Sequence, residues 1–270
     1  MHFIICYAVT FVIVAVGMLA GAGLLHLIPR RGPTGKRISE ALCVAPGLDV
    51  VVTYFTAAPL IVGPIAAGWA GLLGAITGQV VSVLIWTGLH ERINHHKVRE
   101  PRITTVLNRI VGRWNNHAAL WLTAIVTPIF WLIRMCEIFI YPPFRWLVKF
   151  PRYDSSEWVR VSRHKFDGLI GQDLIWCLYC DWMTGVWSLG SEILRNVESF
   201  WCPIRFDDAK KCANCSIDFP DLNKGWIDAG GQIAQVGTLL QDAHGGDTHA
   251  WFGHPVRLTV NGKEPDQTKK

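Results

Sequence analysis

Residues 50–89 form a run of forty residues that contains no Asp, Glu, Lys or Arg. At 1.5 Å per residue a helix of this length measures about 60 Å, twice the roughly 30 Å of a bilayer core. Forty uncharged residues are also more than a buried hairpin of a soluble domain would carry, so we expect the run to cross a membrane twice. The sequence GPIAAG at residues 63–68 is the expected turn between the two crossings.

A second apolar run covers residues 3–28 and is uncharged apart from a possible proton on His26. Its length suits one tilted membrane crossing. A cleaved signal peptide is the alternative, and it would have a basic start and an apolar core of about 7–15 residues. The start here is MHF and the run is longer. We therefore expect an anchor that stays in the mature protein.

Basic residues follow both apolar runs. Arg30, Arg31, Lys36 and Arg37 come after the first run, and residues 90–117 hold six Lys and Arg against two Glu. Such flanks are typical of the cytoplasmic side of a membrane. Apolar residues recur at helical spacing over 103–111, which predicts an amphipathic helix on the membrane surface. We expect this side to contact the bilayer and its anionic lipid headgroups, and we expect no nucleic-acid partner.

The next apolar segment, residues 118–150, leaves two alternatives open. It is apolar for 16 residues, is then interrupted by Arg134 and Glu137, and continues into a proline-containing stretch with Arg145 and Lys149. It forms either a fourth crossing to about residue 141 or a re-entrant, interfacial segment. A crossing would place its last basic residues outside, against the charge rule. The sequence therefore favours the non-crossing alternative, with the C-terminal domain in the cytoplasm.

Five of the eight cysteines fall within 39 residues: Cys177, Cys180, Cys202, Cys212 and Cys215. Two C-x-x-C pairs at this spacing are typical of a four-thiolate site that holds zinc or an iron–sulfur cluster. The fifth thiol, Cys202, could replace either member of the first pair. Disulfides and inert buried thiols are the alternatives. A reducing compartment keeps thiols free, which favours a metal over disulfides.

The predicted fold class is mainly α: a polytopic α-helical membrane protein with a small Cys-rich α+β soluble domain at the C-terminus. A helix is expected over 166–200, and a β-hairpin where VRLTV alternates before Asn261 and Gly262. The predicted regions are an anchor at 1–29, a basic loop at 30–47, a helical hairpin at 48–89, a basic amphipathic segment at 90–117, the ambiguous segment at 118–150 and a soluble metal-binding domain at 151–270.

The sequence from His90 to His96, with His95 next to His96, resembles one histidine box of the membrane di-iron desaturases and hydroxylases. Boxes of that family have the form H-x(3,4)-H or H-x(2,3)-H-H and lie at the membrane edge. The resemblance covers seven residues and implies a metal-dependent membrane enzyme. The family uses about eight histidines in three boxes, and this chain has no second pair of adjacent histidines.

Three late histidines, His244, His249 and His254, recur at five-residue intervals around Asp247. Imidazole and carboxylate ligands together suit a catalytic zinc or iron ion. A metal-dependent membrane enzyme of this histidine-box type is therefore the second alternative function.

The leading hypothesis is a membrane-anchored protein whose Cys-rich domain binds a structural zinc and serves partner binding or assembly of a membrane complex. The first alternative is a membrane-bound iron–sulfur protein that transfers electrons. In each case we expect a protein integral to an inner or plasma membrane, with a protein partner in a membrane complex.

Overall fold

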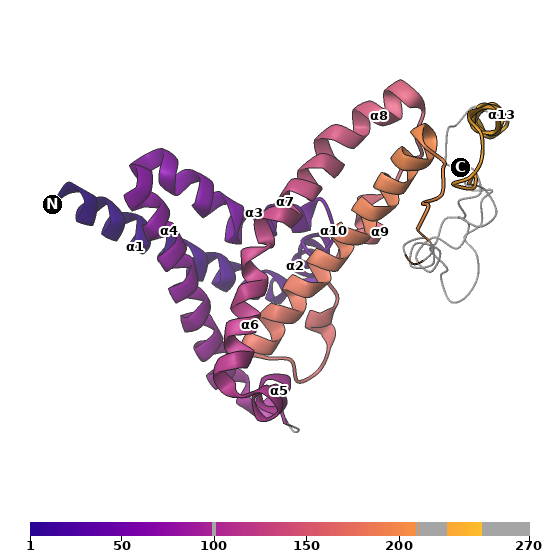
Figure 1. Cartoon of the computed structure of the whole chain (residues 1–270). Coiled ribbons are helices and arrows are strands. Elements are labelled where there is room, and N and C mark those ends of the chain that lie inside the picture. The colour runs from indigo at the N-terminus through magenta and orange to yellow at the C-terminus, as the bar shows by residue number, and fades with distance from the viewer. Residues whose placement is uncertain (99–100, 209, 211–225, 245–270) are drawn as a thin grey trace. The chain divides into compact units, whose positions relative to one another are not determined.

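The computed structural model describes residues 1–98, 101–208, 210 and 226–244 (Figure 1). Of these described residues 81% are helical, and none belongs to a β-strand. Three helical stretches are long and apolar enough to cross a membrane: His2–Arg30, Ala57–Lys97 and Arg113–Val148. The expectation of helices that can span a membrane is therefore confirmed.

Contacts divide the chain into two compact units. The first unit comprises Met1–Arg134 and Asp154–Leu189, and the second comprises Met135–Tyr153 and Gly190–Lys270. The residues 154–189, which open the predicted Cys-rich region, thus belong with the N-terminal helices. Each unit is described by itself below.

In the first unit, α1 (His2–Leu27) packs along α4 (Ala57–Asn94) in parallel orientation. Gly74 of α4 lies against the carbonyl of Tyr7 near the start of α1, and Ser82 Oγ donates to Met18 Sδ at 3.2 Å further along both helices. Glycine allows the backbones to approach this closely. The parallel packing brings the C-terminal ends of both helices to the same side.

The helix α4 is broken near its start. Ala67 and Gly68 leave helical geometry, and the chain folds back so tightly that a Cβ on Gly71 would lie 1.9 Å from the carbonyl oxygen of Gly63. The break falls inside residues 63–68, the turn predicted from the sequence. Two long, differently directed segments of the uncharged run therefore meet at this point.

The chain between α1 and α4 returns through η1 (Ile28–Arg30), α2 (Gly32–Ala41) and α3 (Gly47–Phe55). Tyr54 at the end of α3 donates its hydroxyl to the Gly17 carbonyl of α1 at 2.6 Å. Thr56 interrupts the helix, and Gln79 Nε2 donates to the carbonyls of Phe55 and Thr56 at 2.9 Å each. This side chain satisfies the backbone groups that the break leaves free.

The rest of the first unit is helical as well. Aromatic pairs hold α6 and α7 in parallel along the first half of α10: Trp121 faces Trp176 with ring centroids 5.7 Å apart, and Trp131 faces Trp182 at 5.5 Å. The elements are η2 (His95–Lys97), α5 (Ile103–Val111), α6 (Arg113–Ile125), α7 (Thr127–Met135), α9 (Ser155–Trp158), η4 (Arg163–Lys165) and α10 (Gly171–Trp201).

A short extended contact joins two distant loops of this unit. Val44 forms an isolated antiparallel bridge with Arg160, through Val161 N donating to the Cys43 carbonyl at 2.8 Å and Ala45 N donating to the Val159 carbonyl at 2.9 Å. It is too short to count as a strand, but it fixes the loop before α3 against the segment that precedes α10.

The second unit contains η3 (Cys136–Ile140), α8 (Tyr141–Val148), the end of α10 and α13 (Ile233–His244). Phe150 is buried in an aromatic cluster, with Phe200 at 5.2 Å and Trp201 at 6.1 Å between ring centroids. Asn196 contacts the hydroxyl of Tyr153. An isolated parallel bridge between Ile204 and Ile227 joins the loop after α10 to the loop before α13.

The α+β fold of the predicted Cys-rich domain is wrong for the described residues, which are helices joined by loops. The helix expected over 166–200 is confirmed as α10, and its buried side chains Trp182, Val186 and Leu189 recur at helical rather than strand spacing. The expected hairpin at residues 256–262 lies outside the described residues.

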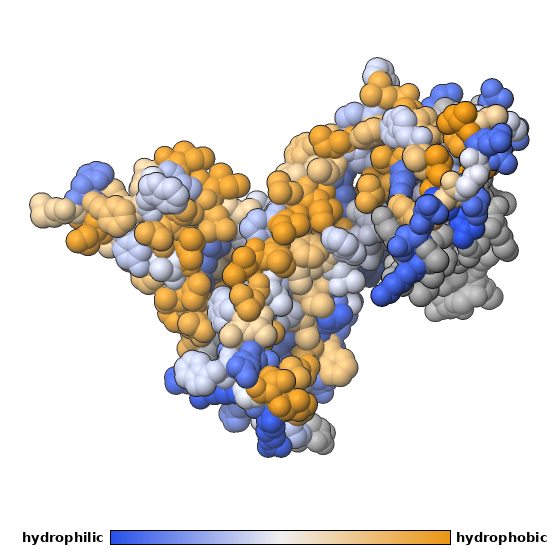
Figure 2. Space-filling view, viewed as in Figure 1, coloured by the Kyte–Doolittle hydropathy of each residue, from blue (hydrophilic) through white to orange (hydrophobic). Residues whose placement is uncertain are grey.

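Large apolar side chains stay exposed on the candidate membrane spans. Ile65, Trp69 and Leu132 are 80%, 77% and 66% exposed, and Figure 2 shows apolar surface over α4 and over α6 and α7. Contiguous apolar surface of this extent is typical of a lipid-facing protein. The stretch Arg113–Val148 is long and apolar enough to cross, which fits the alternative that the sequence did not favour for 118–150.

Candidate functional site

A cluster of charged side chains gathers where the end of α4 meets the starts of α5 and α10, all in the first unit. Glu91 Oε1 accepts hydrogen bonds from Arg102 Nη2 at 2.7 Å and from the backbone N–H of Gln172 at 3.2 Å. The carboxylate therefore sits on the first turn of α10, where free backbone donors and the helix dipole favour a negative charge.

Asp173 supplies the second carboxylate of the cluster and is only 5% exposed. Its Oδ2 accepts from Arg102 Nε at 3.2 Å, and its Oδ1 accepts from the backbone N–H of Thr104 at 3.0 Å and from the Thr104 hydroxyl. Arg102 thus bridges two carboxylates from different helices. The hydrogen bond to Glu91 is the main reason that the pKa of Arg102 is raised above its ordinary value.

Gly171, the first residue of α10, makes the close approach possible. Its φ is +54°, a conformation that side chains with a Cβ rarely adopt, and a Cβ there would lie 2.1 Å from Glu91 Cγ. Its N–H donates to His90 Nδ1 at 3.0 Å, and the His90 ring stacks on Trp86 with centroids 4.6 Å apart. His90 therefore has a structural task at this junction.

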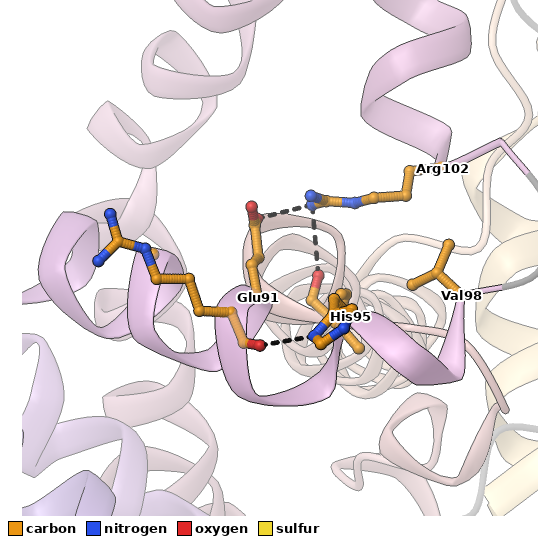
Figure 3. A pocket seen from close by; sticks show the side chains of 7 residues that line it. Glu91, His95, Val98 and Arg102 are labelled. Carbon is orange, nitrogen blue, oxygen red and sulfur yellow. Dashed lines mark hydrogen bonds and ion pairs between the residues drawn. The ribbon is translucent and has the colours of Figure 1, made fainter.

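An open pocket of about 560 Å³ lies beside the cluster. Figure 3 shows Arg102 extending over Glu91, with His95 and Val98 on the same pocket. His95 Nδ1 donates to the Arg92 carbonyl at 2.8 Å, so its Nε2 is the ring atom left for a ligand. The lining residues are Gly88, Glu91, Arg92, His95, Val98, Arg102 and Ile170.

The pocket offers cationic donors rather than a nucleophile. Within the described part of the chain, Arg92 has no carboxylate partner and Arg102 Nη1 has no hydrogen-bond acceptor. Both carboxylates of the cluster are already engaged. The lining set contains no Ser, Thr or Cys. Such a pocket can bind an anion, with two guanidinium groups as donors.

The cysteines predicted as metal ligands are only partly described. Cys177 and Cys180 lie one turn apart on α10 and are half-buried, whereas Cys202 follows the end of α10 and is exposed. Cys212 and Cys215 lie outside the described residues. In the described ranges no three His, Cys, Asp or Glu side chains come together as metal ligands would. The spacing hypothesis therefore stays a prediction.

Arg163 is the polar neighbour of the first thiol pair. Its Nε lies 2.7 Å from Asp181 Oδ1, and its guanidinium is within hydrogen-bonding reach of Cys177 and Cys180. Burial raises the pKa of the Cys177 thiol, and the Arg163 cation offsets part of that rise. The Cys177 thiol is therefore expected in its protonated form at neutral pH, and metal binding would have to release that proton.

The predicted histidine box does not form a ligand set in the described residues. His90 accepts from α10 and His95 donates to a backbone carbonyl, while the His96 ring only faces the His95 ring edge-on at 5.9 Å. The side chains of the late histidines lie outside the described residues.

A second charged site lies deeper in the first unit. Arg134 of α7 binds Asp49 of α3 with both ends of its guanidinium, Nε to Oδ1 at 2.9 Å and Nη2 to Oδ2 at 2.6 Å. Their side chains are 2% and 11% exposed. Beside them Trp131 Nε1 donates to Thr56 Oγ1 at 2.8 Å. Arg134 lies within the candidate span Arg113–Val148, and a charged residue inside a membrane either holds helices together or serves function.

Sequence reasoning missed Asp173, Thr104 and the pairing of Asp49 with Arg134. A usable signal existed for Asp173, because acidic residues are enriched in the first turn of a helix and Asp173 lies near the start of the apolar segment that forms α10. For Asp49 the signal was its isolation directly before the forty uncharged residues. No protein-family model, no curated protein and no solved structure matches this chain.

Proposed function

We propose that the protein is an integral protein of an inner or plasma membrane that binds the anionic surface of one leaflet through its basic side. It presents its polar segments there to a protein partner in a membrane complex. The observation that carries the proposal is the parallel packing of α1 and α4, because it brings Arg30 and Arg31 to the same end as Arg92 and Lys97.

The amphipathic helix α5 supports the same arrangement. None of its residues is buried, and its apolar side chains Ile103, Ile110 and Val111 are 50%, 70% and 47% exposed. Trp114, just after it, is 86% exposed and lies next to Arg113. Apolar side chains and an indole ring beside cations suit the boundary between headgroups and acyl chains.

Labelling from the two sides of the membrane tests this orientation. Thr34→Cys reports the basic side and Ala66→Cys reports the hairpin turn, and both positions are exposed. With an impermeant maleimide and mass-spectrometric assignment, Ala66→Cys should react from outside and Thr34→Cys only after access to the cytoplasmic side. Labelling of both positions from one side would contradict the hairpin, and labelling of Thr34→Cys from outside would contradict the orientation.

The partner part of the proposal has its own measurement. Membranes solubilised in a mild detergent and separated by native electrophoresis should show the chain in a band well above its 30.2 kDa. A band at the mass of one detergent-bound chain under all mild conditions would contradict assembly into a complex.

Zinc held by thiolates stays part of the proposal, with an iron–sulfur cluster as the alternative. Cys177 and Cys180 on one turn of α10 support it, Cys212 and Cys215 supply the second pair of thiolates, and Cys202 could replace either member of the first pair. Metal analysis and a visible spectrum of anaerobically purified protein distinguish the two, since only a cluster absorbs visible light. Protein without stoichiometric zinc or iron would contradict both.

A further inference from the structure

The pocket beside the α4–α5–α10 junction has more positive donors than the protein itself uses. Arg102 donates hydrogen bonds through Nε to Asp173 and through Nη2 to Glu91, which leaves Nη1 without an acceptor among the described residues. Arg92 is exposed and lines the same pocket without a carboxylate partner in the described ranges. Guanidinium groups with unused N–H donors beside an open pocket suit the binding of phosphate oxygens.

The walls of the pocket are not purely polar. Val98 and Ile170 line it together with Gly88, and the exposed apolar side chains of α5 begin at Ile103, one residue after Arg102. A free inorganic phosphate has no apolar group that could contact these side chains. A phospholipid has such groups, and its phosphate and its acyl chains need a cationic site and an apolar surface next to each other.

We infer that this pocket binds the phosphate of an anionic phospholipid headgroup. Arg92 and Arg102 Nη1 donate to the phosphate oxygens, and the glycerol end of the lipid lies against Val98 and Ile170. The Glu91 carboxylate faces the same pocket, but Arg102 and the Gln172 N–H already hold it. The inference rests on the proposed function, which places this end of α4 among headgroups.

The test uses the full chain in a neutral detergent and follows its thermal unfolding. Short-chain phosphatidic acid, short-chain phosphatidylcholine and inorganic phosphate are titrated separately. Phosphatidic acid should raise the unfolding temperature saturably, whereas phosphatidylcholine and inorganic phosphate should not do so at the same concentrations. Arg92→Gln should weaken the apparent affinity for phosphatidic acid about tenfold or more, as expected for the loss of charge-assisted hydrogen bonds.

Arg152→Gln is the matched control, because Arg152 is exposed, carries the same charge and does not line the pocket. It should bind phosphatidic acid like the wild type, and both variants should unfold like the wild type when no lipid is added. His95→Gln provides a second, milder pocket variant, with a smaller loss of affinity.

Three results would overturn the inference. Equal losses in Arg92→Gln and Arg152→Gln would show attraction by overall charge alone, and equal stabilisation by inorganic phosphate would show a free-phosphate site. Phosphatidic acid without a saturable effect would show that the pocket holds no headgroup. If the labelling pattern of Thr34→Cys and Ala66→Cys still holds in that last case, the proposed function stands and only this inference fails.

Discussion

Two arginines of the first unit, Arg134 and Arg102, lie among apolar helices but differ in their burial and in their hydrogen-bond partners. Arg134 is almost fully buried, and the carboxylate of Asp49 accepts two parallel hydrogen bonds from its guanidinium group. Arg102 is 21% exposed and shares its donors between Glu91 and Asp173, so that one nitrogen stays free in the described structure. The first site is closed and the second is open to a ligand.

The difference follows from how solvent acts on charges. A buried charge without its partner is severely destabilising, so Arg134 and Asp49 must match each other closely. A partly exposed charge is screened by water and salt, so imperfect matching at Arg102 costs little. We therefore assign a structural role to the closed pair and a binding role to the open cluster.

Breaking the closed pair should have the largest effect. Arg134→Met leaves Asp49 buried without its cation, and should lower the free energy of unfolding by about 3–5 kcal/mol. The pair of substitutions Asp49→Leu and Arg134→Met should cost less than Arg134→Met alone, because Asp49 is then no longer a buried charge without its cation. Unfolding in detergent, followed by loss of helical signal, measures both.

Arg113→Met is the control for this prediction, since Arg113 is exposed at the start of α6. It should change the free energy of unfolding by no more than about 0.5 kcal/mol. If Arg134→Met were as mild as Arg113→Met, the closed pair would not hold α3 against α7, and the contrast between the two sites would collapse.

Opening the second cluster should have a smaller effect. Asp173→Asn keeps an acceptor for Thr104 but removes the charge that faces Arg102, so the expected loss is about 1–3 kcal/mol. The loss should shrink at 1 M salt, because the cluster is partly exposed. Asp167→Asn, an exposed carboxylate before α10, is the matched control and should be neutral. A loss that is unchanged by salt would place this cluster with the closed pair.

Much of the helical framework could be predicted from the sequence, because long uncharged runs have few other solutions. The break at Ala67 and Gly68 lies inside the predicted turn at 63–68. The α+β fold at the C-terminal end was wrong, since alternation in a short stretch says nothing about the helix that dominates the described part. Contacts such as Val44 with Arg160 join residues far apart in the chain, which local patterns do not show.

Only the basic residues of the open cluster could be predicted from the sequence. Arg92, Lys97 and Arg102 stand out in the sequence as part of a basic segment after an apolar run. Its acidic partner Asp173 lies 71 residues away from Arg102, and only the packing of α10 against α4 brings them together. The predicted histidine box includes His95, which lines the pocket, but its first residue, His90, accepts a hydrogen bond from the start of α10 instead of binding a metal in the described structure.

Arg163, the third arginine of this comparison, is the most exposed at 44%, and its removal should hardly change stability. Its effect should appear at Cys177 instead. Burial raises the pKa of this thiol and the Arg163 cation lowers it, so Arg163→Gln should raise the pKa further. Less thiolate is then present at pH 8, and alkylation by iodoacetamide should be roughly twofold slower.

The pH dependence of that alkylation decides whether charge is the cause. Arg163→Gln should shift the midpoint of the rate profile of Cys177 to higher pH and leave its plateau at high pH unchanged, whereas a change in access would alter the plateau. Lys165→Gln removes a neighbouring cation of the same loop that acts on Cys43 rather than on Cys177, and should leave the Cys177 profile as in the wild type. A midpoint that stays in place in Arg163→Gln would mean that exposed cations do not tune this thiol. Of the three arginines compared, only Arg134 and Arg102 would then have a measurable effect on the groups around them.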